Sequence, residues 1–365
     1  MKAKAQNRIF KGLMIFSIAV VVALLLLILG FVAYQGVGEI DGQFLTGDFD
    51  AKTAYVDIDT SDGLNIEVEE REYDKKNYIK ISKIEGARSI DGVLKNGDEF
   101  NLRVGDIIKS VNKGKTEDMS PDEFRLLSGT LGDTTTMKVV RPGEGIFPLM
   151  MNTLMMIGLS LLFALPLSIF SAIYLAEYAK PGKLLNLIRF TTSSLAAIPS
   201  IIFGLFGMLV FVTVFHLGFS LIAGSLTLSI VLLPTIIGQT EEAIRRVPNA
   251  FREGSSALGA TKLQTIFKVT IPNSLSGIVV GVLLSIGRIV AESAALILTA
   301  GTVARIPASL MESASTITVK AYTVAKETGN IQLACAMGIV AIVLIIVVNA
   351  AVGIVRRFDK MKQYE

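Results

Sequence analysis

The segment from Phe190 to Thr240 contains no charged residue over 51 positions. As one straight helix it would be roughly 77 Å long, more than twice the thickness of the hydrocarbon core of a bilayer. We therefore expect two membrane spans here. The break between them should fall at His216-Leu217-Gly218, where a polar residue and a glycine coincide. A chain with such a segment is expected to be an integral membrane protein.

Four further segments are apolar enough to cross a bilayer, which takes about 20 mostly apolar residues. They are Leu13–Tyr34, Ile146–Ala176, Val269 to about Ala300, and Ile331–Val355. With the two spans above, the sequence predicts an all-α polytopic membrane protein with six transmembrane helices. The first segment is longer than the apolar core of a signal peptide and no A-x-A site follows it, so we expect it to remain as the first span.

Lysine and arginine are distributed unevenly among the short loops. If the N-terminus lies inside the cell, 16 of the 20 basic residues outside the segment 39–144 fall on the inner side. Basic residues in short loops favour the cytoplasmic side. The sequence therefore predicts that both termini are cytoplasmic, which agrees with an even number of spans.

The segment 39–144 has 23 acidic and 15 basic residues, whereas the remainder of the chain has 9 acidic and 20 basic residues. A polar, acidic segment of this length next to apolar spans indicates a separate water-soluble domain. We divide the chain into an N-terminal segment with the first span (1–38), an extracytoplasmic domain (39–145) and a membrane domain (146–365). The soluble domain follows the first span, so it is expected outside the cell membrane.

The soluble segment shows signals for both strands and a helix. Ile79–Ile84 alternates as a half-buried strand does, and Val104–Val111 reads as a turn followed by a strand. Ser120 precedes Pro121, and Glu123 lies where it can close a capping box, so a short helix is expected to begin there. Thr134–Val140 is rich in residues that favour strands. A small α+β fold is expected.

Gly105-Asp106-Ile107-Ile108-Lys109-Ser110-Val111-Asn112, followed by Gly114, resembles the G-D-x-I-x-x-V-N-G core of bacterial PDZ domains. The resemblance covers roughly 63–143, with Lys113 inserted before the glycine. PDZ domains hold a peptide carboxylate on the backbone of a Gly-Leu-Gly-Phe-like loop. The acidic segment Glu69–Lys76 stands in its place and would repel a carboxylate. The resemblance implies a PDZ-like fold, and we favour a spacer or docking role over peptide binding.

The loop between the fourth and fifth predicted spans carries a spaced motif. Glu253-Gly254-Ser255 is followed after three residues by Gly259 and after nine more by Val269-Thr270-Ile271-Pro272. We expect two short helices to meet at Gly259, and Pro272 to open the next span, where its missing N–H costs little. The spacing resembles the E-A-A-x3-G-x9-I-x-L-P motif of ABC importer permeases. That resemblance implies an ATPase coupling loop at 241–272, with motif residues Glu253, Gly254, Ser255, Gly259, Val269, Ile271 and Pro272.

Two further segments resemble the A-type permease subunit of the phosphate-specific (Pst) transporter. Leu195–Gly207 is similar to G-I-P-S-I-x-x-G-L-F-G, and Arg288–Ala300 is similar to R-x-x-G-E-T-A-P-L-L-x-T-A. The second departs from that pattern at Ala291, Ser293 and Ala295. From about Gly145 to its C-terminus, the chain is identified as a member of the MetI-like binding-protein-dependent permease family.

The resemblance implies a permease subunit that moves inorganic phosphate inward by alternating access, in the plasma membrane of a prokaryote. ATP hydrolysis is expected in a partner subunit, so this chain would be a transport subunit rather than an enzyme. ATP and Mg would bind to the ATPase, and no cofactor is expected in this chain. The implied partners are a companion permease subunit, a cytoplasmic ATPase dimer and an extracytoplasmic phosphate-binding protein; nucleic acid is not among them.

Arg288 and Glu292 are ionisable residues deep inside a predicted span. They are four positions apart, so we expect them to share one helix face. Charges in a bilayer are costly and usually face a bundle interior or water. Arg288 could offer its planar donor fork to a phosphate oxyanion, with Glu292 orienting it or competing for it. A self-neutralising structural pair fits the residue chemistry equally well, and the family resemblance favours a substrate pathway.

Other functions and sites remain to be weighed. Sulfate or molybdate could replace phosphate as the transported oxyanion, and a PDZ-bearing membrane sensor without transport is a further alternative. A zinc protease needs H-E-x-x-H, which the single residue His216 excludes. The single Cys335 excludes a disulfide within the chain, and no metal site is expected. The hydroxyl run Thr191–Ser194 could line a path, but we expect it to pack between helices.

Overall fold

The computed structural model describes residues 2–47, 49, 52–59, 64, 66–73, 76–84, 89–90, 92–94, 102–103, 105–112, 114–128, 134–141, 143 and 145–362. The chain divides into two compact units. One, the inserted unit, is Thr46–Gly145. The other, the helical unit, combines Met1–Leu45 with Ile146–Glu365. The insertion thus separates the first helix from the rest of the helical unit along the sequence.

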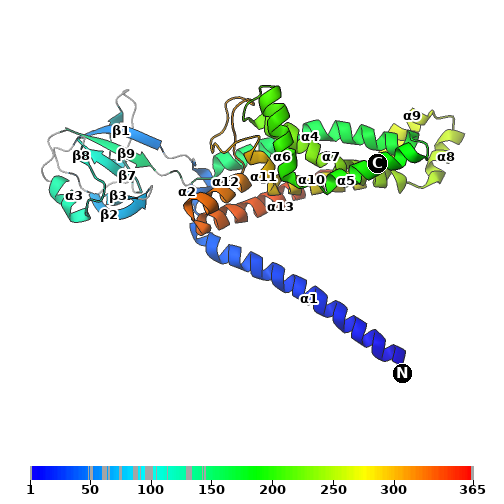
Figure 1. The fold of residues 1–365 in the computed structure, drawn as a ribbon, viewed down its shortest axis with the longest axis horizontal. Helices are drawn as coiled ribbons and strands as arrows, with labels where there is room; N and C mark the ends of the chain where they lie inside the picture. The colour runs from blue at the N-terminus through cyan, green and yellow to red at the C-terminus, as the bar shows by residue number, and fades with distance from the viewer. Residues whose placement is uncertain are drawn as a thin grey trace. The chain divides into compact units, whose positions relative to one another are not determined.

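The helical unit is built of long helices joined by short ones (Figure 1). Its elements are α1 (Lys2–Gly36), η1 (Val37–Glu39), α2 (Gly42–Thr46), α4 (Phe147–Ile173), η2 (Tyr174–Tyr178), α5 (Lys183–Ala196), α6 (Ser200–Gly207), η3 (Met208–Val214), α7 (Leu221–Arg245), α8 (Asn249–Ala257), α9 (Lys262–Thr265), η4 (Ile266–Thr270), α10 (Ile271–Ala291), α11 (Ala294–Ile297), α12 (Ile317–Thr323), η5 (Val324–Thr328) and α13 (Ile331–Lys362). The elements η2 to η5 are π-helical, and each continues the helix before it.

Five helical segments of the described chain are long and apolar enough to cross a membrane. They are Phe10–Glu39, Phe147–Tyr178, Leu221–Arg245, Lys262–Ala291 and Ile331–Gly353. The pair Lys183–Ala196 and Ser200–Val214 passes the same test only together, and it is bent by 96°. The predicted six spans therefore correspond to five continuous candidates and, if the bent pair counts as one span, a broken sixth.

The bend of the broken pair lies at Pro199. Proline lacks the N–H that would continue the helical ladder, and its ring disfavours helical geometry at the residue before it. The second break was predicted correctly: η3 ends at Val214 and α7 begins at Leu221. Between them His216 and Gly218 have φ values of 53° and 63°, which end the first helix.

Small residues let the helices of the unit approach closely. Helix α7 packs against α4 on one side and α10 on another. A Cβ at Gly207 would lie 2.1 Å from Thr227 Oγ1, and one at Gly224 would lie 2.8 Å from Ala300 Cβ. Such contacts are the usual basis of helix association in membranes. Helix α1 contacts α13 near Gly36. Toward its N-terminus the apolar helix diverges from the other helices (Figure 1).

The inserted unit contains an antiparallel sheet with strand order β2-β3-β7-β9-β1-β5, and β8 pairs with β7. Its elements are β1 (Lys52–Asp59), β2 (Ile66–Tyr73), β3 (Lys76–Ile84), β4 (Ser89–Ile90), β5 (Gly92–Leu94), β6 (Leu102–Arg103), β7 (Ile107–Val111), β8 (Gly114–Lys115), α3 (Pro121–Ser128) and β9 (Thr134–Arg141). Strands β4 and β6 form a separate pair. One face of the sheet buries Val56, Ile79, Ile108 and Met137 together with Phe124 of α3.

The local predictions for this unit are confirmed at several points. Ser120 and Glu123 form the expected reciprocal capping box, with distances of 2.9 and 3.3 Å, and the helix begins at Pro121. The strands expected near Ile79–Ile84 and Thr134–Val140 are β3 and β9. The segment Glu69–Lys76, interpreted as replacing a loop, instead contributes to paired strands β2 and β3. Lys113 lies outside the described residues.

Candidate functional site

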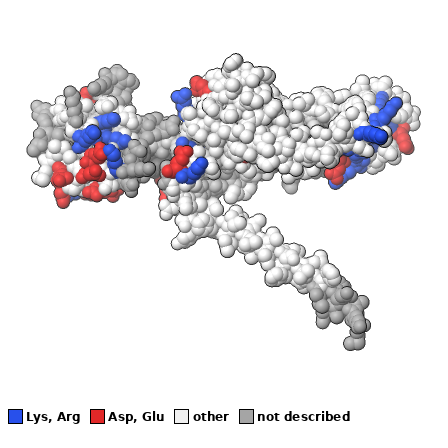
Figure 2. Space-filling model, viewed as in Figure 1, with Lys and Arg blue, Asp and Glu red and all other residues white. Residues whose placement is uncertain are grey.

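Helices α8 and α9 lie at one end of the helical unit, where charged side chains gather (Figure 2). The two helices are separated at Gly259, which has a φ of 79°, so they meet where the sequence predicted. Thr261 then starts α9 with a capping box to Gln264. Large apolar side chains are exposed on this segment: Phe251, Leu258, Leu263 and Phe267, with Leu258 90% exposed. Exposed apolar side chains gathered on one segment indicate a surface that another protein or the membrane covers.

The motif residues of this loop fall into two groups. Glu253 and Gly254 are exposed on α8, and a Cβ at Gly254 would meet nothing within 4 Å. Ser255 is half-buried, and its hydroxyl lies 2.9 Å from that of Thr265, which joins α8 to α9. Glu253 and Gly254 are therefore open to a partner, whereas Ser255 helps to hold the two helices together.

Val269, Ile271 and Pro272 lie where the loop enters the long helix. Ile271 packs against the buried cluster of Ile173, Ile244 and Ile266. Helix α10 begins at Ile271 with Pro272 in its first turn, as predicted, and α9 and η4 precede it without a break, so the helical segment runs from Lys262 to Ala291. The π-helical turn η4 directly precedes Ile271, and such insertions are one way a helix accommodates a local irregularity. The carbonyl of Val269 accepts a hydrogen bond from the Asn273 side-chain amide at 2.7 Å.

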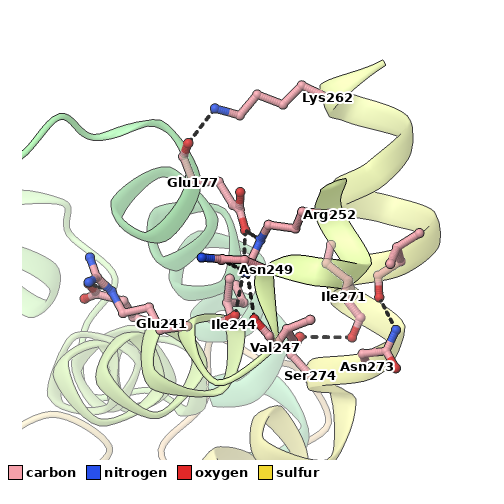
Figure 3. Close-up of polar contacts among 12 residues, drawn as sticks. Glu177, Glu241, Ile244, Val247, Asn249, Arg252, Lys262, Ile271, Asn273 and Ser274 are labelled. Carbon is pink, nitrogen blue, oxygen red and sulfur yellow. Dashed lines mark hydrogen bonds and ion pairs between the residues drawn. The ribbon is translucent and has the colours of Figure 1, made fainter. Parts of the chain in front are cut away.

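Arg252 links α8 to the ends of two long helices (Figure 3). Its Nε and Nη2 lie 3.0 Å from Glu177 Oε1, at the end of the α4–η2 helix. Its guanidinium also donates to the carbonyl oxygens of Ile244, at 2.8 Å, and Val247, at 2.7 Å. Ile244 lies in the last turn of α7, where carbonyls lack partners within the helix, and Val247 lies two residues beyond its end. Arg252 therefore caps α7 and binds α4 with one side chain.

Lys262 makes a second connection to the same helix end. Its Nζ donates to the carbonyl oxygen of Glu177 at 2.5 Å and lies 4.2 Å from the centre of the Tyr178 ring. A cation over an aromatic face is attracted to the ring electrons. Both short helices are thus fastened to the end of α4, and a force applied to α8 or α9 would reach α4 and α7 directly.

A second charged cluster joins α5 to α7. Arg189 donates to Glu241 Oε1 through Nε at 3.0 Å and through Nη2 at 2.7 Å. Arg245 donates to the same oxygen through Nε at 3.0 Å. Glu241 is buried, so two guanidinium groups share one shielded carboxylate. The cluster fixes the first half of the broken span against α7.

Arg288 and Glu292 do not share the helix face that their spacing predicted. Helix α10 ends at Ala291, and Glu292 is extended, with φ −78° and ψ 125°. The buried Glu292 carboxylate accepts a hydrogen bond from the backbone N–H of Ala295 at 3.2 Å. Arg288 is half-buried and its Nη1 lies 3.4 Å from Thr235 Oγ1. Among the described residues the two side chains form no ion pair, so the interpretation as a self-neutralising pair is wrong for this structure.

Sequence reasoning did not identify the bonds of Glu177, Arg189 and Arg252. Arg252 adjoins the motif, but its partner Glu177 is 75 positions away and nothing in the spacing connects them. Their positions in the sequence could have pointed to them. All three residues lie at or beyond the ends of uncharged segments, where charged side chains are tolerated and can pair with one another. Within the described part of the chain, no group of three or more His, Cys, Asp or Glu side chains could hold a metal ion.

Comparison with known proteins identifies relatives of the helical unit. Residues 164–358 match the family described as "Binding-protein-dependent transport system inner membrane component". "Probable ABC transporter permease protein YqgI" of Bacillus subtilis is 36% identical over 168 residues, which is 46% of this chain and 57% of that protein. "Phosphate transport system permease protein PstA 1" of Mycobacterium tuberculosis is 34% identical over 171 residues, 46% of this chain and 56% of that protein.

The chain therefore spans little more than half the length of these curated relatives. Among solved structures, inward-facing conformations of the MetNI methionine ABC transporter align with a TM-score of 0.46 and 18% identity, over 58% of this chain and 93% of that chain. The residues matched by the family all lie in the helical unit. The inserted unit is outside that match.

Proposed function

The chain belongs to the family of binding-protein-dependent transport system inner membrane components, and we propose that it is the permease subunit of an ABC importer for inorganic phosphate. Relatives named as PstA phosphate permeases, 34–36% identical in M. tuberculosis and Pasteurella multocida, favour phosphate as the substrate. The observation that carries the proposal is that Arg288 lies in a candidate span without a carboxylate partner among the described residues. Its guanidinium lies within the candidate span Lys262–Ala291, and its partner is a hydroxyl rather than a carboxylate.

The positive charge of a guanidinium this deep in a span has to be balanced by a nearby negative charge or by water. Charged groups inside a bilayer are costly and usually face a bundle interior or a water-filled cavity. Arginine presents five N–H donors in a planar fork that matches the oxygens of phosphate or sulfate. Glu292 accepts a hydrogen bond from the backbone N–H of Ala295 and, among the described residues, forms no ion pair with Arg288. A transported oxyanion would supply the missing negative charge, and we assign Glu292 to the wall of the pathway.

The α8–α9 segment would couple transport to a partner ATPase. Its exposed apolar side chains offer a docking surface, with Leu258 at the turn between the helices. Arg252 and Lys262 connect that surface to the ends of α4 and α7. Movement of an ATPase dimer on binding ATP would therefore shift these helices as one piece and alternate access to the pathway. ATP and Mg would be held by the ATPase.

The proposed assembly contains a companion permease subunit, an ATPase dimer and a phosphate-binding protein, in the plasma membrane of a prokaryote. Both termini and the α8–α9 segment would be cytoplasmic, in keeping with the basic residues in the short loops. The inserted unit would then be extracytoplasmic. Helix α1 exposes its apolar side chains along its length, and lipid or the companion subunit would cover them.

We also propose a PDZ-like fold for the inserted unit, with a spacer or docking role. The G-D-x-I-x-x-V-N core supports it: Gly105, with a φ of 98°, turns into β7, and the order then runs β8, α3, β9. The acidic side chains of Glu69 and Glu70 are exposed on β2, where they would disfavour a peptide carboxylate.

Uptake of labelled phosphate into vesicles containing the whole importer tests the role of Arg288. Arg288→Gln should abolish ATP-dependent uptake, whereas Arg305→Gln should retain it, because Arg305 is exposed and pairs with Glu312 outside the proposed pathway. Sulfate and molybdate serve as competitors and should not reduce uptake at equal concentration. Uptake that survives in Arg288→Gln would return Arg288 to a structural role, and preferential uptake of another oxyanion would replace phosphate as the substrate.

A further inference from the structure

A second cationic site lies beside a cavity that the proposed path through Arg288 does not include. The cavity has a volume of about 360 Å³ and lies between α5 and α7. Its polar lining comes from Arg189, Thr192, Ser193 and Glu241, and Pro234 and Ile237 are among its apolar residues. The hydroxyl run that was expected to pack between helices therefore contributes two residues to a cavity wall.

The charge of this site is not balanced by its own groups. Arg189 and Arg245 both donate to Glu241 Oε1, so the cluster holds two positive charges and one negative charge. Glu177 is engaged by Arg252, and Glu242 by Arg246, so these neighbouring carboxylates already have partners. The cluster therefore carries a net charge of about +1 next to a cavity, which favours an anion there.

The cavity also offers hydrogen-bond donors. Of the five N–H groups of Arg189, two are directed to Glu241, and Nη1 has no hydrogen-bond partner among the described residues. The hydroxyl of Thr192 donates to the carbonyl of Ile188 and can only accept further bonds. The hydroxyl of Ser193 has no intramolecular bond within the described part of the chain and can donate. A guanidinium edge and a serine hydroxyl together suit a tetrahedral oxyanion.

We propose that this cavity is a second oxyanion site on the transport path, nearer to the α8–α9 end than Arg288. The inference rests on the proposed function of the chain as an oxyanion importer. Thr235 contacts Arg288, and Glu241 lies six residues further along α7, about 9 Å at 1.5 Å per residue. An anion released by Arg288 would thus find a second guanidinium one to two helical turns nearer the cytoplasmic exit.

Glu241 gives this site a moderate affinity. Glu241 shares Arg189 with the bound anion and also binds Arg245. Its negative charge therefore offsets part of the attraction between the two arginines and the anion. A site on a conduction path has to bind well enough to be entered and weakly enough to be left. Glu241→Gln should remove the competition and tighten anion binding, while slowing its release.

Protection of a thiol in the cavity tests the proposal without depending on transport. In the assembled importer, Cys335→Ala removes the native thiol, and Ala196→Cys places a new one in the cavity wall without altering a polar group. The rate of labelling by a small thiol reagent is measured against inorganic phosphate, with chloride at equal ionic strength as the reference. Phosphate should slow labelling in a saturable manner, and Arg189→Gln should abolish that protection.

The Glu241→Gln variant should lower the phosphate concentration for half protection roughly fivefold, equivalent to about 1 kcal/mol. Glu242→Gln is the matched control, since Glu242 also lies in α7 and pairs with an arginine four residues on, Arg246, but does not line this cavity. It should leave the half-protective concentration unchanged. If Arg189→Gln does not assemble, Arg189→Lys, which keeps the charge without the fork, should still weaken protection.

Equal labelling rates in phosphate and chloride would overturn the second site. The result is separable from the proposed function. Phosphate uptake without protection would keep the importer and remove this site, whereas protection without any uptake would keep an oxyanion site and contradict the importer.

Discussion

The connection made by Arg252 allows a quantitative test of how α8 is held to the long helices. Removal of the guanidinium by Arg252→Gln eliminates its ion pair with Glu177 and its bonds to the carbonyls of Ile244 and Val247. The side chains of Arg252 and Glu177 are only 22% and 11% exposed. Breaking a fully buried pair costs about 3–5 kcal/mol, and partial exposure of the arginine reduces this to about 2–3 kcal/mol.

A double-mutant cycle isolates the ion pair from the other bonds. The cycle combines Arg252→Gln with Glu177→Gln, and it should give a coupling energy of about 1–2 kcal/mol in the free energy of unfolding. The matched control is Arg246 with Glu242, which are 76% and 56% exposed. That pair should couple by no more than about 0.5 kcal/mol, as exposed pairs four apart on a helix do.

The assay is unfolding of the purified chain in mixed micelles by titration with a denaturing detergent, together with ATP hydrolysis and uptake by the assembled importer. Arg252→Gln should reduce uptake per ATP hydrolysed while the ATPase remains bound, because α8 would no longer move α4 and α7 together. A coupling energy equal to that of the control pair would refute the reasoning. Unchanged uptake per ATP hydrolysed in Arg252→Gln would refute it independently.

Further perturbations test the packing, the capping and the orientation. Gly207→Ala should destabilise the chain by about 2–3 kcal/mol, because its Cβ would lie 2.1 Å from Thr227 Oγ1, whereas Gly158→Ala meets nothing within 4 Å and should be neutral or stabilising in the same unfolding titration. Thr261→Ala should lose about 1 kcal/mol with the capping box of α9. In cells that produce the chain with Cys335→Ala and without the ATPase, a cysteine replacing Leu258 should react with a membrane-impermeant reagent only after the cells are permeabilised; labelling of intact cells would reverse the orientation.

Features governed by local sequence were predictable. The break at His216 and Gly218, the capping box of Ser120 and Glu123, and the turn at Gly259 each depend on residues within a few positions of one another. Their physical causes act within one helical turn. The same reasoning failed at Pro199, which was included in a continuous span, although a proline there bends the segment by 96°.

The candidate site depends on contacts that the spacing does not encode. Arg252 meets Glu177 across 75 positions, and Arg189 meets Glu241 across 52. The spacing of Arg288 and Glu292 suggested a shared helix face, but α10 ends between them and redirects Glu292 to the backbone of Ala295. Helical periodicity applies only as far as the helix continues, and this helix ends at Ala291.

Accumulation of labelled phosphate by vesicles that contain the complete importer tests the central claim most directly. The measurement compares the wild-type assembly with one whose ATPase subunit cannot hydrolyse ATP, both with ATP on the side of α8 and α9 and phosphate with its binding protein on the other side. The account predicts accumulation against a gradient in the first assembly and none in the second. Equal phosphate levels in the two, with both shown to be assembled, would contradict it.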